Sequence, residues 1–201
     1  MTVEPLTTYR DEPAFQAEDP GQWRSWLAAH HDDPSPGVWL VTWRRGSGHH
    51  VPGYEPWIEE ALAFGWIDGQ ASVVDDGRHA LWFTRRRRGS RWTRLSKERV
   101  ARVEADGRMT DAGRAVVDAA KADGSWTRHD DAEALVVPDD LATALADRPC
   151  AREKFDAFTP GARRAILGWI VEARRPETRA RRVAETAELA EQGVPAHQPR
   201  R

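Results

Sequence analysis

The chain of 201 residues has one cysteine, Cys150, and therefore cannot close a disulfide bond within itself. No CxxC pair and no cysteine/histidine spacing of a structural zinc site accompanies it. No window approaches the roughly eighteen apolar residues of a membrane helix, and the opening stretch MTVEPLTTYRDEPAF lacks the basic and apolar regions of a signal peptide. We therefore expect a cytoplasmic protein that does not insert into membranes.

The signatures of well-known enzyme classes are also missing. The chain has no GxGxxG, Walker, GxSxG or HExxH motif. Two histidine pairs, His30–His31 and His49–His50, lack the i, i+4 spacing that places two imidazoles on one helix face. The sequence thus predicts neither a metal site nor a cofactor, and it leaves open whether the protein is an enzyme.

Charge is distributed unevenly along a chain whose net charge is -2. Residues 1–80 hold 13 acidic and 5 basic residues, whereas residues 84–108 hold 10 basic and 3 acidic ones. The stretch FTRRRRGSRW, residues 83–92, contains five arginines between aromatic residues. Either the acidic half neutralises the basic segment within the fold, or the segment offers a basic face to an anionic partner.

The hydrophobic pattern predicts an α+β fold. Apolar residues recur with helical spacing over residues 19–31 and 54–64, and VWLVTW, residues 38–43, reads as a central strand because both of its faces are apolar. A hairpin is predicted around the turn at residues 75–77, and the pattern beyond residue 90 is helical. Ile166, Trp169, Ile170 and Ala173 form an apolar stripe with helical spacing, and the turn at residues 174–176 predicts a second helix antiparallel to this one. Helix starts are predicted at Asp19, Thr110 and Thr159. We predict a small antiparallel sheet of about three strands with flanking helices, followed by a helical C-terminal unit.

Composition divides this fold into two parts. The predicted α+β N-terminal domain covers residues 1–123, and the helical C-terminal unit covers residues 141–192. The stretch between them, residues 124–140, is polar and contains a proline, which is typical of a linker. Residues 193–201 are predicted to form a loose tail. The sequence does not indicate an oligomeric state.

The stretch FGWIDG, residues 64–69, places a carboxylate where a helix gives way to a strand, a kind of junction at which sites are commonly built. Two interpretations of Asp68 stay open. In the first, it is a catalytic acid or base in a pocket with Trp66 and Gly69. In the second, it pairs with an arginine, Arg86 or Arg87, and stabilises the fold, and Trp66 is a core residue.

The arginine-rich segments suggest anion recognition, because guanidinium groups bind phosphates and carboxylates bidentately. The residues predicted to form this surface are Arg86, Arg87, Ser90, Trp92, Arg179 and Arg182. Trp92 is expected to stack on a base or ring, so that the ligand is either a small anion or a nucleic acid. A solvated helix face explains the C-terminal arginines as well. A third alternative is a protein interface formed by exposed Trp23, Trp26 and Trp39.

Four segments resemble, in the same order, the YdeI/OmpD-associated family, whose members are often called bacteriocin-protection proteins. They are EEALAFGWIDG (59–69), FxxRRxxSxW (83–92), GRMTxxG (107–113) and RRAILGWIVEARRPETRARRV (163–183). The resemblance spans roughly residues 20–192 and implies a soluble bacterial binding or stress-tolerance protein, without implying a reaction or catalytic residues. Ala63 departs from the family, which often has cysteine there.

Overall fold

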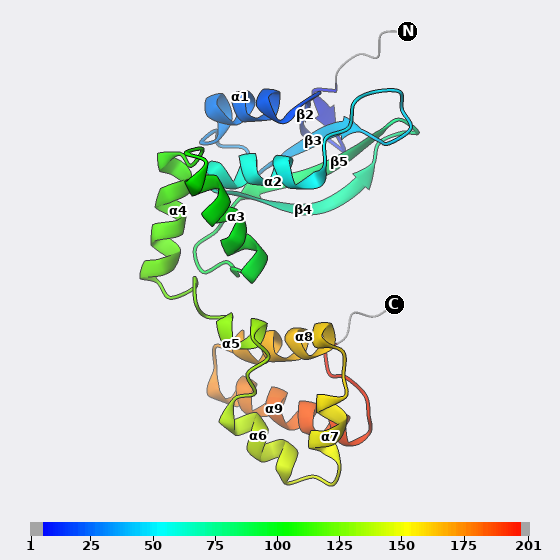
Figure 1. The fold of residues 1–201 in the computed structure, drawn as a ribbon, viewed down its shortest axis with the longest axis vertical. Helices are drawn as coiled ribbons and strands as arrows, with labels where there is room; N and C mark the ends of the chain where they lie inside the picture. Colours follow the sequence, from blue (N-terminus) through cyan, green and yellow to red (C-terminus); the bar gives the residue numbers. More distant parts are fainter. Residues whose placement is uncertain (1–5, 198–201) are drawn as a thin grey trace. The chain divides into compact units, whose positions relative to one another are not determined.

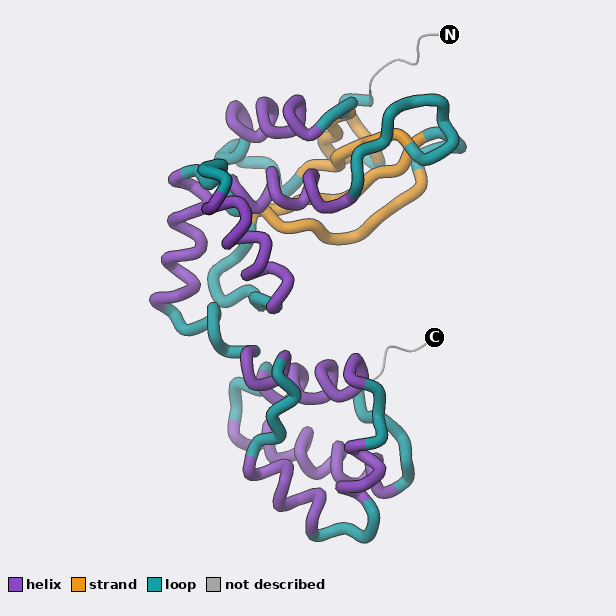
Figure 2. Tube along the Cα trace, viewed as in Figure 1, coloured by secondary structure: helices purple, strands orange, loops and turns teal. Residues whose placement is uncertain are grey.

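The computed structural model describes residues 6–197, which form two compact units (Figure 1). The first unit comprises the described residues up to Ser90 together with Leu95–Gly124. The second comprises Arg91–Arg94 and the described residues from Ser125 onward. Within residues 6–197, strands occur only in the first unit (Figure 2). None of the helices in this part of the chain has the length and apolar character that a bilayer crossing requires.

The first unit is built on a five-stranded sheet with the order β1-β2-β3-β5-β4. The strands are β1 (Thr8–Tyr9), β2 (Glu12–Gln16), β3 (Val38–Trp43), β4 (Trp66–Val73) and β5 (Arg78–Arg85). The α+β class is therefore confirmed, and the predicted hairpin is the antiparallel pair β4–β5. The sheet is larger than predicted, because β1 and β2 are short and only partly buried. It is also mixed, since β2 and β3 are parallel.

Four helices belong largely to this unit: α1 (Pro20–His30), α2 (Tyr54–Ala63), α3 (Arg94–Ala105) and α4 (Asp111–Ala122). The helix α1 begins at a cap in which the Asp19 side chain accepts a hydrogen bond from the Gln22 backbone. It connects β2 to β3, and such a helical crossover is what allows the two strands to run parallel. Its buried Trp23 packs on Phe83 of β5, with ring centroids 5.2 Å apart.

The two faces of the sheet are set by the register of β3 against β5. Leu40 lies opposite Leu81, on the face covered by α1 and α2. The other face carries Trp39, Val41 and Ala80, which pack with partly buried residues including Tyr9. Trp23 and Trp39 are both buried, so the interface predicted from exposed tryptophans is wrong at these positions.

The GRMTxxG motif brings α4 against the end of α2. The Thr110 hydroxyl caps α4 and donates a 2.6 Å hydrogen bond to the carbonyl of Ala63. A Cβ atom on Gly113 would lie 2.2 Å from the same carbonyl oxygen, so only glycine allows this approach. Gly65 then ends α2 with a positive φ of +78°, which the following strand requires.

The second unit consists of helices: α5 (Asp130–Glu133), α6 (Asp139–Ala146), α7 (Ala151–Asp156), α8 (Pro160–Val171) and α9 (Pro176–Glu191). The predicted apolar stripe of α8 lies in the core, where Ile166 and Ile170 are fully buried. Thr159 caps α8 with its side chain and Pro160 occupies the first helical turn. The helix pair α8–α9 forms as the sequence indicates.

The predicted linker and part of the predicted tail are more ordered than expected. The predicted linker, residues 124–140, contains α5, and all of it except Gly124 falls in the second unit. Its buried Ala132 packs in the core of that unit, and its Trp126 contacts Trp92. The predicted loose tail contributes buried Ala196 to the same core. The last part of the predicted tail, residues 198–201, lies outside the described residues.

Candidate functional site

Asp68 lies half-buried on β4 and holds the first residue of α2. The hydroxyl of Tyr54 donates a 2.5 Å hydrogen bond to its Oδ2 atom. The guanidinium of Arg99, from α3, lies over the Tyr54 ring, with its central carbon 5.9 Å from the ring centroid. Arg99 also forms a bidentate ion pair with Glu55, with distances of 2.8 and 2.7 Å. The start of α2 is thus tied to both β4 and α3.

Burial and hydrogen bonding set the pKa of the arginines near Asp68, and the charge of Asp68 makes a smaller contribution. Burial lowers the pKa of Arg86 to about 10, and the negative charge of Asp68 acts in the opposite direction. The hydrogen bonds with Glu55 raise the pKa of Arg99, burial opposes them, and Asp68 again favours the charged form. The direct hydrogen bond of Asp68 is with Tyr54, whereas the arginines are linked to it only through its charge, so both interpretations of Asp68 stay open.

The two other residues of the predicted FGWIDG pocket lie apart from any cavity described below. Trp66 is buried, and its indole N–H donates a 3.2 Å hydrogen bond to the carbonyl of His31. Gly69 is exposed on β4, and Trp82 lies beside it. Trp66 is therefore a core residue, as one of the open alternatives would have it.

The six residues predicted to form an anion-binding surface divide equally between the two units. In the first unit, Arg86 is buried, Arg87 is exposed, and the Ser90 hydroxyl donates to the Arg87 carbonyl. In the second unit, Trp92 is only 2% exposed and packs 4.9 Å from Trp126, so it is not placed to stack on a ligand. The sequence could not show this burial, because the partner comes from the segment predicted to be a linker.

The two C-terminal arginines of that predicted surface both have contacts within the second unit. Arg179 forms a bidentate ion pair with Asp140, with distances of 2.7 and 3.0 Å. Arg182 lies over the ring of Trp169, 4.8 Å from its centroid, and donates a hydrogen bond to its carbonyl. These contacts hold α9 against α6 and α8, and they explain the arginines without a ligand.

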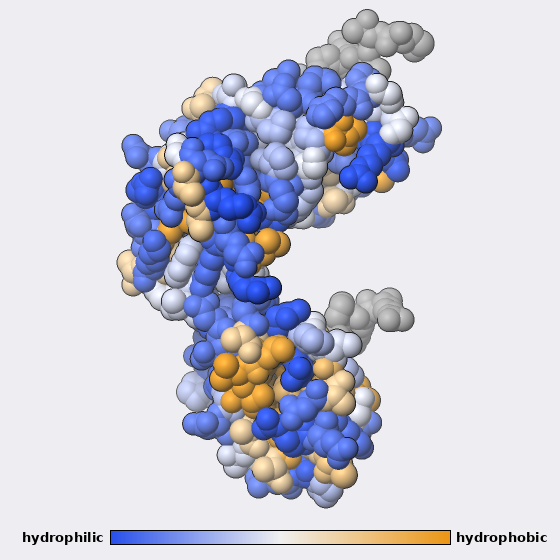
Figure 3. All heavy atoms as spheres, viewed as in Figure 1, coloured by the Kyte–Doolittle hydropathy of each residue, from blue (hydrophilic) through white to orange (hydrophobic). Residues whose placement is uncertain are grey.

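Three of the ten basic residues of the segment 84–108 form ion pairs with glutamates of α2: Arg99, Arg102 and Arg108. Arg102 and Arg108 each approach Glu59 at 2.7 Å, and Arg108 also approaches Glu60 at 2.9 Å. Arg24 of α1 binds Glu60 from the other side at 2.7 Å. Burial alone would raise the pKa of Glu59, but the hydrogen bonds from Arg108 and Arg102 outweigh it and lower this pKa. The surface over α3 and α4 is predominantly hydrophilic on the face seen in Figure 3.

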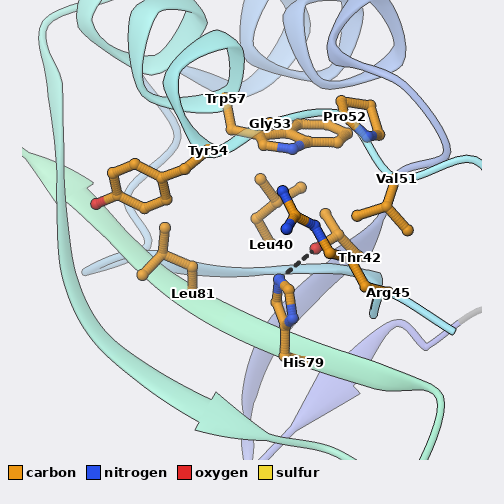
Figure 4. Close-up of a pocket in the computed structure, with 10 residues that line it drawn as sticks. All are labelled: Leu40, Thr42, Arg45, Val51, Pro52, Gly53, Tyr54, Trp57, His79 and Leu81. Carbon is orange, nitrogen blue, oxygen red and sulfur yellow. Dashed lines mark hydrogen bonds between the residues drawn. The ribbon is translucent and has the colours of Figure 1, made fainter.

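A pocket of about 270 Å³ lies in the first unit, between the start of α2 and the sheet (Figure 4). Its lining residues come from β3, β5, the loop before α2 and α2 itself. They are Leu40, Thr42, Arg45, Val51, Pro52, Gly53, Tyr54, Trp57, His79 and Leu81. Tyr54 is shared with the Asp68 cluster, so the predicted FGWIDG junction supports one wall of the pocket.

Two side chains of the pocket, Trp57 and Arg45, offer hydrogen-bond donors to the cavity. The Trp57 side chain is only 5% exposed, and its indole N–H has no acceptor within residues 6–197. Figure 4 shows this nitrogen on the ring edge that faces the cavity, and the Arg45 guanidinium directed toward the same space. Arg45 has no hydrogen bond or ion pair with any described residue. Both donors are open to the cavity, so a ligand that supplies acceptor oxygens can form hydrogen bonds with them.

A hydroxyl and an imidazole meet on the sheet side of the pocket. Thr42 Oγ1 and His79 Nε2 are 2.9 Å apart. Burial, together with the positive charge of Arg44, lowers the pKa of His79 and favours its neutral form. No sequence motif indicates this pair, because the two residues meet through the register of β3 and β5, 37 positions apart.

Comparison with known families matches both units. Residues 15–116, just over half of the chain, match the model of a domain of unknown function, DUF8412. Residues 134–193 match the model described as "Bacteriocin-protection, YdeI or OmpD-Associated". No curated protein and no solved structure matches the chain.

The predicted family resemblance is confirmed, and the match to it lies in the C-terminal part of the chain. The first three motifs that carry the resemblance, within residues 59–113, fall in the stretch matched by the other family. The fourth, RRAILGWIVEARRPETRARRV, falls within the bacteriocin-protection match. The chain therefore belongs to the DUF8412 family over its N-terminal half and carries a YdeI/OmpD-associated domain at its C-terminal end.

Proposed function

We propose that the protein binds a small anionic molecule in the pocket at the start of α2. The observation that carries this proposal is the pair of donor groups, the Trp57 indole N–H and the Arg45 guanidinium, which face a cavity and have no acceptor in the described chain. An anion would satisfy both groups with charge-assisted hydrogen bonds. The anion-recognising role predicted from the sequence is thereby moved from the arginine-rich loop to this pocket.

An enzymatic role is the second candidate, and it depends on the contact between Thr42 and His79. A hydroxyl within hydrogen-bond distance of a neutral imidazole is the arrangement of a nucleophile and its base. No carboxylate within residues 6–197 forms an ion pair or hydrogen bond with the second imidazole nitrogen of His79. Because such an orienting group is part of efficient catalytic triads, we favour binding over catalysis.

Nucleic-acid binding receives less support from the structure than from the sequence. Several arginines of the basic segment pair with glutamates, whereas Arg87 and Arg88 are exposed without a partner in the described chain. Two such arginines would release few counterions, so a salt series with short DNA and RNA strands should give a logarithmic slope no steeper than about −2. A slope several times steeper would support a nucleic-acid footprint instead.

A calorimetric titration with benzenesulfonate, an anionic molecule with one aromatic ring, tests the proposed pocket. We expect Arg45→Gln to weaken its binding about tenfold, because it removes the cation that faces the cavity. The matched control is Arg88→Gln, which removes the same charge from an exposed position of the same unit outside the pocket. Equal effects of the two substitutions, or no binding by the wild-type protein, would overturn the proposal.

We also propose a cytoplasmic role in stress tolerance, of the kind that the C-terminal family description names. Ligand binding in the first unit would be required for that role. A bacterial strain that lacks the protein should regain bacteriocin tolerance with the wild-type gene but not with the Arg45→Gln variant. Full tolerance with the variant would separate the pocket from this role.

A further inference from the structure

We infer that the pocket selects an aromatic monocarboxylate over phosphates and over small aliphatic acids. The inference rests on the proposed function and adds the class of ligand to it. Three properties of the lining residues support it: the number of charges, the arrangement of donors and the apolar walls.

The charge of the pocket matches a single negative charge. Arg45 supplies one positive charge, and it is free of internal partners in the described chain. The other titratable side chains of the lining are Tyr54, whose hydroxyl is bound to Asp68, and His79, which contacts Thr42. A phosphate monoester carries between one and two negative charges near neutral pH, and so one guanidinium would leave part of its charge uncompensated.

The donors also match a carboxylate better than a phosphate. A carboxylate has two oxygens, which the guanidinium and the Trp57 indole N–H can bind together. Phosphate sites usually add a run of backbone N–H groups. Here the segment Val51-Pro52-Gly53-Tyr54-Glu55-Pro56 lacks two of them, because Pro52 and Pro56 have no N–H. A third phosphate oxygen would find few donors in this segment.

The walls of the pocket favour a flat apolar body. Figure 4 shows Trp57 and Pro52 on the helix side, and Leu40 and Leu81 facing them from the sheet. The volume of about 270 Å³ lies just below the range of drug-sized sites, roughly 300–1,000 Å³, and so suits a molecule with one or two rings. A small aliphatic acid such as acetate would leave these walls uncovered and would bury little apolar surface.

Isothermal titration calorimetry on the full chain tests this class of ligand. The probes are benzoate, acetate, phenyl phosphate and inorganic phosphate. We expect benzoate to bind at least about tenfold more tightly than acetate, because of the ring, and than phenyl phosphate, because of the charge and donor match. The expected spectroscopic mark is a shift of the Trp57 indole N–H resonance on addition of benzoate.

Variants distinguish failure of the proposed ligand class from failure of the proposed pocket. Arg45→Gln should weaken benzoate binding about tenfold, Trp57→Phe should weaken it several-fold while keeping an aromatic wall, and Arg88→Gln should leave it unchanged. If phenyl phosphate binds more tightly than benzoate and still depends on Arg45, the class is wrong and the proposed pocket holds. If neither aromatic anion binds, or if Arg45→Gln and Arg88→Gln behave alike, both inferences fail. Since Arg45 is exposed and unpaired, its substitution tests the proposal even if Trp57→Phe unfolds.

Discussion

The hydroxyl of Tyr54 donates a 2.5 Å hydrogen bond to the carboxylate of Asp68, which joins the wall of the pocket to the FGWIDG motif. Because Tyr54 is the first residue of α2, this bond fixes where the helix begins relative to β4. Asp68 therefore has a positioning role toward the pocket, which it does not itself line.

The Tyr54 phenol should remain protonated beyond its ordinary pKa of 10.0. Partial burial, the hydrogen bond to Asp68 and the charge of that carboxylate all raise its pKa. Because an unfolded chain would release this proton at about pH 10, Tyr54 contributes stability below that pH, and the contribution is lost as the pH rises further.

Near-ultraviolet absorbance of tyrosinate checks this prediction. In a Tyr9→Phe background the signal reports Tyr54 alone, since the chain has 2 tyrosines. Asp68→Asn should shift the titration midpoint to lower pH by removing the charge. An unchanged midpoint in Asp68→Asn would show that the carboxylate does not act on the phenol.

Glu59→Gln should destabilise the first unit by about 2 kcal/mol, because it leaves two arginines near a neutral amide in a largely buried position. The pKa of Glu59 is lowered from 4.5, so the ionised form stabilises the fold above that pH and the contribution is lost as the pH falls through the folded pKa. The free energy of unfolding, measured in urea at neutral pH and at about pH 4, should therefore decrease less between the two pH values in the variant than in the wild type.

The control for Glu59→Gln is the exposed pair Arg152–Asp156 of α7, with side chains 52% and 42% exposed. Arg152→Gln should change the free energy of unfolding by less than about 0.5 kcal/mol. Equal effects at the two sites would mean that burial of the Glu59 network contributes nothing.

Gly113→Ala should destabilise the protein by about 1–3 kcal/mol, because the added Cβ atom would lie 2.2 Å from the carbonyl oxygen of Ala63. Gly161→Ala, in the first turn of α8, is the matched control: nothing lies within 4 Å of its Cβ position. It should be neutral or stabilising by about 0.5 kcal/mol. Thermal unfolding of both variants checks the contrast, and similar melting temperatures would contradict the close approach of α4 to α2.

Trp92→Ala should destabilise the second unit by about 3–5 kcal/mol, because the side chain is buried against Trp126. Trp92→Phe should cost less, since it keeps an aromatic ring in the same place. The control is Arg87→Ala, at an exposed position without a partner in the described chain, which should stay within about 0.5 kcal/mol. Wild-type stability in Trp92→Ala, measured by chemical unfolding, would mean that Trp92 is available to a ligand after all.

The sequence by itself determined the α+β class, the hairpin β4–β5 and the helical C-terminal unit. It also determined local features such as the caps at Asp19, Thr110 and Thr159 and the buried stripe of α8. These features depend on residues within a few positions of one another, because hydrophobic periodicity and helix capping are local properties of the sequence.

Tertiary structure alone decided the parallel pairing of β2 with β3, the partners of the arginines, the burial of Trp92 and the pocket. Thr42 meets His79 across 37 positions, and Glu59 meets Arg108 across 49. The sequence does not show which distant group a charged side chain or a hydroxyl will contact, because that contact depends on strand register and helix packing. The candidate site was therefore visible in the sequence only at Asp68, which supports the pocket through Tyr54.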